Sequence, residues 1–231
     1  MSTDTDDATI RIVDTLLEAD ILAVGDDEQL QMTPAFATRV DDCRATVIES
    51  DSEELLDELV SLTEDRDEAE RLLDASEGAD EILGEYLALS QADLQELSHT
   101  DRLRVLTLFD AIGNSRPPTR GVPDGFVPVH GERLPFLLRV YERAIVYIWL
   151  DECRDCDVMK DVLSDVRTDS FDDLTSIAVY GPNSARLLHE EYSVPGGPAT
   201  LFVLDGTVDA RLYGAHDEHV IEKQIQTLRS L

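Results

Sequence analysis

Two of the three cysteines in the chain, Cys153 and Cys156, are spaced as C-x-x-C at the start of a helical pattern. The pair follows the apolar, β-type run Ala144–Leu150. A cysteine at a helix N-terminus faces unpaired backbone N–H groups and the positive end of the helix dipole, and both favour the thiolate. Because the second cysteine lies one turn later, it can attack a mixed disulfide on the first. The spacing predicts reversible thiol–disulfide chemistry, with Cys153 as nucleophile and Cys156 as resolving thiol.

Other uses of the cysteine pair are open at this stage. A C-x-x-C pair also occurs in metal sites, and His216 and His219 are the nearest further ligands, on one helix face by their i,i+3 spacing. Tetrahedral zinc prefers a better-defined ligand set, so we expect no metal here and interpret the histidines as a surface pair. A relic pair without activity is the other alternative. The third cysteine, Cys43, lies in a helical segment and is interpreted as a small structural residue.

From about residue 130 onward, strand-like and helical patterns alternate along the chain. After the strand and helix around the cysteines, the residues predict a strand at 174–180 and a helix at 183–192. Residues 199–204 and 208–213 flank Asp205-Gly206, a strong hairpin turn. An amphipathic helix from 215 to 231 closes the chain. The predicted order is β-α-β-α-β-β-α, an α/β domain with a central mixed sheet.

This domain resembles thioredoxin at landmarks that follow one another in the right order. They are the strand, tryptophan and C-x-x-C stretch 145–156, the helix 183–194, the proline-containing segment 197–206 and the small-residue turn 213–215. The resemblance covers only the C-terminal half. It implies a thioredoxin-like fold and a cis bond before Pro198, facing the cysteines. It also implies that Gly197, Pro198, Trp149 and Gly214 form the substrate-binding surface.

The residues beside the cysteines depart from the family pattern. Arg154-Asp155 lies between the cysteines in place of Gly-Pro, Glu152 replaces a tryptophan, and Tyr147 replaces a buried acid. We call the four carboxylates around the pair the acidic cluster: Asp151, Glu152, Asp155 and Asp157. Their negative field disfavours the thiolate, and Arg154 partly offsets it. We therefore expect a reducing rather than an oxidising couple.

The first half of the chain is mostly helical, and the resemblance does not reach it. Residues 1–115 form a predicted acidic, mostly helical domain, with a short hairpin pairing Ile21–Val24 with Gln29–Met32. The helix, hairpin and Thr33-Pro34 resemble part of a winged-helix domain, but the candidate recognition helix offers only Arg11 as a cation. Residues 116–131 are a predicted Pro/Gly-rich linker, since five of the nine prolines lie between Pro117 and Pro135. The thioredoxin-like domain is predicted to span 132–231.

The net charge of the chain indicates the solvent in which the protein works and the partners it does not bind. Fifty acids against 19 bases give a formal charge of −31, and only two of the bases are lysines. Such self-repulsion destabilises a compact state in dilute salt and is screened at molar salt, so we interpret the composition as adaptation to a salt-rich cytoplasm. It argues against nucleic-acid binding, which needs clustered Lys and Arg. The acidic start lacks the features of a secretory signal, and no apolar run is long enough to span a membrane.

The sequence thus predicts a cytoplasmic dithiol–disulfide oxidoreductase, acting on disulfides of proteins or small molecules and recycled by an unknown reductant. No P-loop, dinucleotide fingerprint, metalloprotease motif or nucleophile elbow occurs, so no cofactor is expected. No nucleic-acid or membrane partner is expected either. The alternative is a non-catalytic thioredoxin-fold module that binds proteins or senses redox state.

Overall fold

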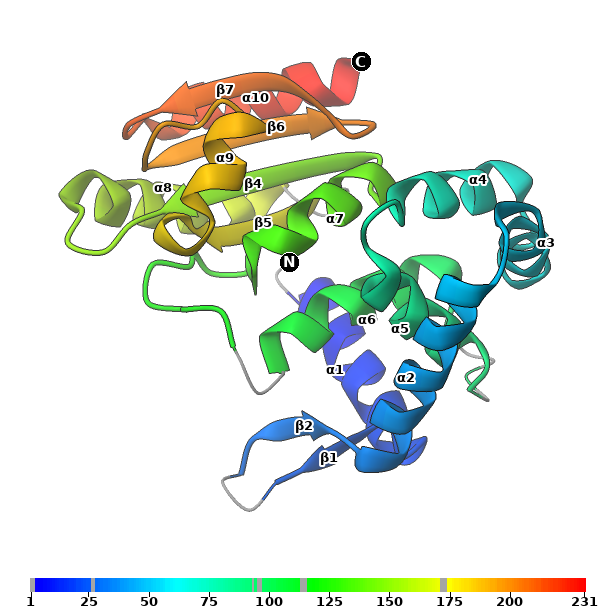
Figure 1. Ribbon diagram of the computed structural model, residues 1–231. Helices are drawn as coiled ribbons and strands as arrows, with labels where there is room; N and C mark the ends of the chain where they lie inside the picture. The colour runs from blue at the N-terminus through cyan, green and yellow to red at the C-terminus, as the bar shows by residue number, and fades with distance from the viewer. Residues whose placement is uncertain (1–2, 26–27, 93, 95–96, 113–115, 171–173) are drawn as a thin grey trace. The chain divides into compact units, whose positions relative to one another are not determined.

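The chain forms two compact units, Thr3–Ser115 and Arg116–Leu231. The structure, a computed structural model, describes residues 3–25, 28–92, 94, 97–112, 116–170 and 174–231. Figure 1 shows a helical N-terminal unit and a C-terminal unit built on a sheet. Each unit is described by itself below.

The N-terminal unit consists of helices and one two-stranded sheet. Its elements are α1 (Thr3–Glu18), β1 (Leu22–Val24), β2 (Leu30–Met32), α2 (Pro34–Glu49), α3 (Ser52–Thr63), α4 (Arg66–Ala75), α5 (Asp80–Ser90) and α6 (His99–Ile112). Strands β1 and β2 are antiparallel, with Leu22 opposite Met32, which confirms the predicted hairpin. Its predicted turn residues Asp26 and Asp27 lie outside the described residues. Helices α2 and α5 pack closely at Gly84, where an added Cβ would lie 3.0 Å from the Arg44 backbone nitrogen.

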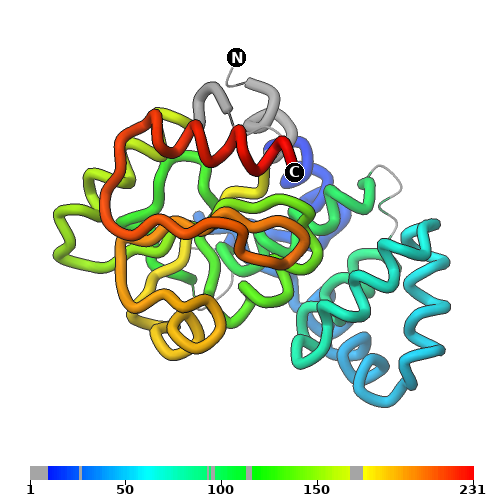
Figure 2. Tube along the Cα trace, turned by 90° about the horizontal axis from the view of Figure 1, so that it is seen from above, coloured from blue at the N-terminus to red at the C-terminus, as the bar shows by residue number. Residues whose placement is uncertain are grey.

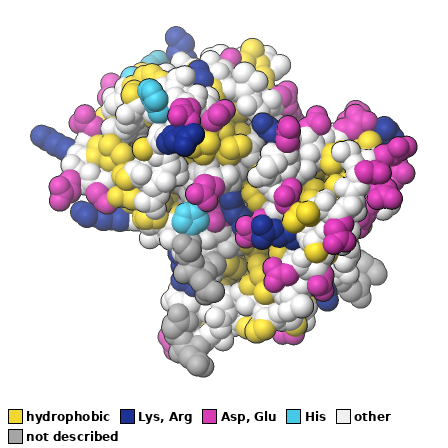
Figure 3. All heavy atoms as spheres, in the orientation of Figure 1, with side chains coloured by type: hydrophobic (Ala, Val, Ile, Leu, Met, Phe, Trp, Pro, Cys, Tyr) yellow, Lys and Arg dark blue, Asp and Glu magenta, His cyan; other side chains and the backbone are white. Residues whose placement is uncertain are grey.

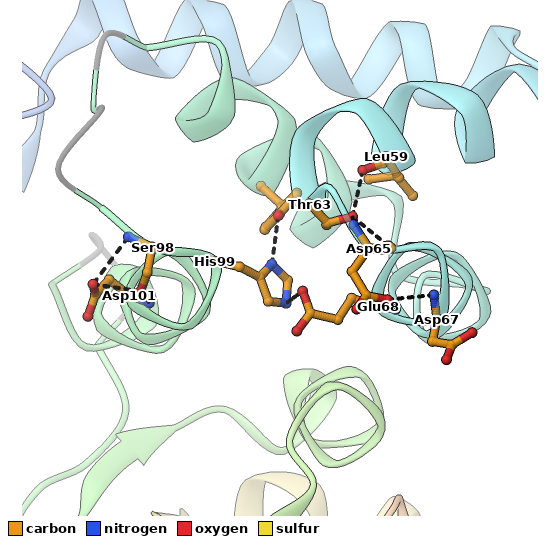
Figure 4. A network of polar contacts seen from close by, with 9 residues as sticks. Leu59, Thr63, Asp65, Asp67, Glu68, Ser98, His99 and Asp101 are labelled. Carbon is orange, nitrogen blue, oxygen red and sulfur yellow. Dashed lines mark hydrogen bonds and ion pairs between the residues drawn. The ribbon is translucent and has the colours of Figure 1, made fainter.

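Helix starts in this unit follow capping chemistry. Thr33 caps α2, since its Oγ1 accepts from the Phe36 N–H at 3.2 Å. The sequence suggests a start of α6 at Arg102, with Thr100 as its cap, and this is wrong: α6 begins at His99. Ser98 Oγ accepts from the Asp101 N–H at 3.1 Å, and Asp101 Oδ2 accepts from the Ser98 N–H at 3.2 Å (Figure 4). This reciprocal capping box moves the helix start three residues earlier.

The buried Tyr86 of α5 contacts the partly buried His99 at the start of α6, and His99 points toward Glu68 of α4 (Figure 4). The Tyr86 hydroxyl lies 2.8 Å from His99 Nδ1, and His99 Nε2 lies 3.8 Å from Glu68 Oε2. Burial lowers the pKa of His99, with Arg102 and Arg71 acting in the same direction and Glu68 against them. The neutral imidazole is therefore favoured, and it can accept from Tyr86 while its Nε2–H points toward Glu68.

The C-terminal unit is a five-stranded mixed sheet covered by helices. Its elements are β3 (Val127–Val129), η1 (Gly131–Arg133), α7 (Leu134–Val140), β4 (Arg143–Trp149), α8 (Arg154–Ser170), β5 (Thr175–Tyr180), η2 (Gly181–Ser184), α9 (Ala185–Glu190), β6 (Ala199–Leu204), β7 (Thr207–Tyr213) and α10 (Glu218–Ser230). The strand order is β3-β5-β4-β6-β7. β3 and β4 run parallel to β5, while β6 is antiparallel to both β4 and β7.

Two elements of this unit are absent from the predicted order. β3 lies within the stretch predicted as a linker, 116–131, and it pairs with β5 through Val127 opposite Ile177. Pro128 at the centre of β3 argues against a strand when the sequence alone is considered. β3 is an edge strand, however, and proline is tolerated there. Helix α7 follows after the short helix η1, with a proline in its first turn. The sheet therefore begins before the boundary expected at residue 132.

Helices cover both faces of the sheet (Figure 1). Helices α8 and α10 pack on the face that carries Ile145, Tyr147 and Trp149 of β4. Figure 2 shows α10, red, alongside the β6–β7 hairpin, orange. Helices α7 and α9 lie over the other face (Figure 1). Strand β4 is therefore covered on both sides, which explains its nearly continuous run of buried residues.

The surface carries the acidic charge of the composition. In Figure 3, Asp and Glu side chains are scattered over the face shown, on both units, with few Lys and Arg among them. Within the described residues, no helix is long and apolar enough to cross a membrane.

Candidate redox site

The two predicted redox cysteines lie where β4 passes into α8. β4 ends at Trp149, and the chain turns through Glu152, whose φ is +52°, before α8 begins at Arg154. Cys153 and Cys156 are joined in a disulfide. Cys156 is 3% exposed, whereas Cys153 is partly exposed. The arrangement leaves Cys153 as the sulfur that a partner can reach and shields Cys156 beneath the helix.

The start of α8 directs one backbone N–H group, that of Cys156, toward the outer sulfur. The Cys156 N–H lies 3.2 Å from Cys153 Sγ, and the Cys156 and Asp157 N–H groups also donate to the Cys153 carbonyl. The Cys156 N–H, shared between this sulfur and the Cys153 carbonyl, and the dipole of α8 both favour negative charge on Cys153 in the reduced state. The acidic cluster opposes this effect, and all four of its residues are exposed, as is Arg154. Exposed charges are screened by salt, whereas the Cys156 N–H acts at contact distance.

Tyr147 lies beneath the pair, at the position where the resemblance implies an acid. Its side chain is fully buried, and its hydroxyl donates to the Cys156 carbonyl at 2.8 Å. Burial raises the pKa of Tyr147 well above its ordinary value, and the charge of Asp157 acts in the same direction. The group below the cysteines is therefore a neutral phenol that ties β4 to the first turn of α8.

Trp149 is placed under the site rather than on its surface. Its side chain is 2% exposed, and its ring lies 4.7 Å from the ring of Tyr180, whose hydroxyl donates to Asp151 Oδ2 at 2.5 Å. Gly121 also lies against the indole, where an added Cβ would be 2.2 Å from Trp149 Cε3. This burial agrees with an interpretation of Trp149 as core packing beneath the active-site helix, where the indole supports the β4–α8 junction, while its place in the substrate-binding surface stays a prediction.

The segment that covers Trp149 is attached to α8. Lys160 Nζ donates to the Arg120 carbonyl at 3.1 Å, and the Asp124 N–H donates to Ser164 Oγ at 2.9 Å. Val122 packs against the same apolar cluster that contains Cys156. This stretch, within the predicted linker, is therefore part of the support of the redox pair.

Gly197, Pro198 and Gly214 come together on the other side of the pair. The Gly197–Pro198 bond is cis, as the resemblance implies. The Gly197 carbonyl lies 4.0 Å from Cys153 Sγ, and the Gly214 N–H donates to the Pro198 carbonyl at 2.8 Å. The structure therefore gathers these three predicted site residues beside the exposed sulfur. Sequence reasoning missed the contacts of Gly121 and Tyr180 with Trp149, because these contacts join segments far apart in the chain. It also missed Arg211 and Tyr213 of β7, which donate to the carbonyls of Tyr192 and Ser193 in the loop before Gly197.

The other candidate groups do not join the pair. Among the described residues, no group of three or more His, Cys, Asp or Glu side chains is arranged to hold a metal ion. His216 Nε2 instead lies 3.0 Å from the Tyr213 carbonyl. Cys43 is a buried thiol 3.5 Å from Gln91 Oε1, and burial, followed by the charge of Glu58, raises its pKa.

The strand order, the cysteine pair at the start of α8 and the cis proline opposite it define a thioredoxin-like fold for the C-terminal unit. The resemblance proposed from the sequence is confirmed at this level. This fold is confined to the C-terminal unit, Arg116–Leu231, as was expected.

The matching solved structures include thioredoxins, at low identity. A variant thioredoxin from Halobacterium salinarum is 18% identical, with a TM-score of 0.39, and covers 45% of this chain and 92% of its own. Mitochondrial thioredoxin 3 from Saccharomyces cerevisiae is 16% identical, with a TM-score of 0.40, and covers 44% and 94%. A structure of the yeast mitochondrial 1-Cys peroxiredoxin system is 18% identical, with a TM-score of 0.36, and covers 39% and 83%. No protein-family model and no curated protein matches the chain.

Proposed function

We propose that the protein is a dithiol–disulfide oxidoreductase that uses Cys153 and Cys156. The observation that carries the proposal is the disulfide at the start of α8, with one sulfur partly exposed and the other buried. This asymmetry suits a two-step exchange, because a partner reaches one sulfur and only the second cysteine reaches the resulting bond. The substrate is a disulfide-bearing protein or small molecule, and a reductant of unknown identity recycles the pair.

The exchange is balanced in two steps. The Cys153 thiolate attacks one sulfur of the substrate disulfide, forms a mixed disulfide and expels the first substrate thiolate. The Cys156 thiol, after losing its proton to solvent, attacks Cys153 Sγ and expels the second substrate thiolate. The substrate gains two electrons and two protons in all, and the protein ends with the Cys153–Cys156 disulfide. A dithiol reductant then reverses these steps on the protein.

The test is reduction of insulin and of hydroxyethyl disulfide by the reduced protein in molar salt. We expect Cys153→Ser to abolish turnover with both substrates. Cys156→Ser should instead accumulate a mixed disulfide that mass spectrometry detects. Cys43→Ser is the matched control, because that thiol is buried in the N-terminal unit, and it should retain the wild-type rate. Equal rates for wild type and Cys153→Ser would refute the proposal.

The acidic cluster favours one second candidate, a redox-sensing or protein-binding module without turnover. Its four exposed carboxylates disfavour the thiolate that exchange requires. Such a module would form and break the disulfide slowly and would not turn over insulin. A single oxidation of the pair by a small disulfide, without multiple turnovers in the presence of excess dithiol, would support this candidate over the enzyme.

A further inference from the structure

The loop between α9 and β6 carries the residues that face the exposed sulfur. It runs from Glu191 to Pro198, and Pro195 and Gly196 are exposed while Gly197 is partly exposed. An added Cβ at Gly196 would meet no atom within 4 Å, so open space lies over this stretch. The Gly197 carbonyl is the group of this loop that lies 4.0 Å from Cys153 Sγ.

Two side chains of the edge strand β7 hold this loop. Arg211 Nε donates to the Tyr192 carbonyl at 2.9 Å, and the Tyr213 hydroxyl donates to the Ser193 carbonyl at 2.8 Å. Arg211 and Tyr213 are two residues apart, so their side chains point to the same face of the strand. They bind two consecutive carbonyls of a loop in which Ser193 has a φ of +58°.

The loop is therefore attached at each end and open in the middle. The Val194 N–H donates to the Leu188 carbonyl at 2.8 Å, and the Gly214 N–H fixes the Pro198 carbonyl at the same distance. Between these attachments, Pro195 and Gly196 are exposed, and Gly197 packs against Leu150, since an added Cβ there would lie 3.0 Å from Leu150 Cγ. The position of this stretch relative to Cys153 depends on that packing and on the attachments, two of which come from β7 side chains.

We propose that Arg211 and Tyr213 are positioning residues that set the loop for polypeptide disulfides. This inference rests on the proposed function. A polypeptide that presents its disulfide to Cys153 must also lie along residues 195–197, whereas a small disulfide need only reach the exposed sulfur. Releasing the loop therefore weakens binding of the polypeptide and leaves the reactivity of Cys153 unchanged. Because Tyr213 is 48% exposed, its removal creates no buried cavity.

The experiment compares two substrates in Tyr213→Phe and Arg211→Gln. The substrates are a synthetic disulfide-bridged peptide and hydroxyethyl disulfide, both at molar salt. We expect the KM for the peptide to rise about fivefold in each variant, the factor expected for one hydrogen bond of ordinary strength. The kcat for the peptide and the rate with hydroxyethyl disulfide should stay within about twofold of wild type. Asp209→Asn is the control, because it changes an exposed residue of the same strand that makes neither loop contact.

The outcomes separate this proposal from the function on which it rests. An unchanged peptide KM in both variants, or a parallel loss with both substrates, overturns the positioning role and leaves the enzyme intact. A merely structural role would move both substrates together, in proportion to the folded fraction measured by Trp149 emission. If wild type reduces neither substrate, the proposed function fails and the positioning role falls with it.

Discussion

The buried hydroxyl of Tyr147 offers a direct test of how the redox site is held. It donates to the Cys156 carbonyl at 2.8 Å, in the first turn of α8. Tyr147→Phe removes this hydrogen bond and keeps the ring, so no methyl-sized cavity is created. The carbonyl has two lone pairs and keeps its place in the helical backbone, so it is not left unsatisfied. The variant therefore isolates a single buried hydrogen bond.

We expect Tyr147→Phe to lower the free energy of unfolding of the C-terminal unit by about 1 kcal/mol, the net value of one such bond. For a unit of this size, that change lowers Tm by about 3–6 °C. The measurement is urea unfolding of the oxidised protein at constant molar salt, followed by tryptophan emission. Trp149 is the only tryptophan in the chain and belongs to the C-terminal core, so its emission reports on this unit alone.

The matched control is Tyr192→Phe. Tyr192 is 8% exposed, and its hydroxyl makes no hydrogen bond to a described residue, so its loss should change the free energy of unfolding by less than about 0.5 kcal/mol. Equal losses in the two variants would mean that removing any phenol hydroxyl has this cost. No loss in Tyr147→Phe would refute the stabilising role assigned to the Cys156 contact.

Four further predictions concern other parts of the molecule. Burial depresses the pKa of His99 below its ordinary value of about 6.5. The neutral His99 side chain therefore stabilises the folded state above that pH, and this contribution is lost as the pH falls below it. Far-UV circular dichroism melts of wild type and His99→Gln should converge in acid. Gly121→Ala should destabilise the C-terminal unit by about 1–3 kcal/mol and shift Trp149 emission, since the new Cβ overlaps the indole. Glu152 has a φ of +52°, which a β-branched residue tolerates poorly and glycine tolerates well. Glu152→Val should therefore have a free energy of unfolding in urea about 1–2 kcal/mol lower than Glu152→Gly. In reduced Cys156→Ser protein, alkylation of Cys153 by iodoacetamide at pH 7 should accelerate about two- to threefold between 0.1 and 1 M salt, and neutralising the acidic cluster should remove this dependence.

The parts of the fold that the sequence predicts are those with long, uniform patterns. Strand β4 is an apolar run from Ala144 onward, and α8 keeps a helical pattern for several turns after it. Strand β3 was missed because it has three residues with Pro128 at its centre, and the pattern of so short an edge strand resembles a linker. The sequence does not predict helix α7 for a similar reason. Pro135 lies in its first turn, and proline is common both in first helical turns and in linkers.

The site divides in the same way. Cys153, Cys156 and Pro198 belong to motifs that are local in sequence, and the structure brings them together. Sequence reasoning cannot identify the role of Gly121. A glycine is required there because any Cβ would overlap the indole of Trp149, which lies far along the chain. The Arg211 and Tyr213 contacts also depend on the register of β7 against β6, which places both side chains beside the α9–β6 loop.

The buried neighbours of the redox pair are neutral, and its charged neighbours are exposed. The buried residues named here beside the cysteines, Tyr147 and Trp149, are neutral, and Tyr147 stays neutral because burial raises its pKa. The carboxylates of the acidic cluster are all exposed. Buried charges would act on the thiol at any ionic strength, but exposed ones lose most of their effect when the Debye length falls to about 3 Å in molar salt. Under those conditions the Cys156 N–H and the dipole of α8 become the dominant influence on Cys153. The acidic composition that suits a salt-rich solvent is therefore compatible with a reactive thiolate in that same solvent.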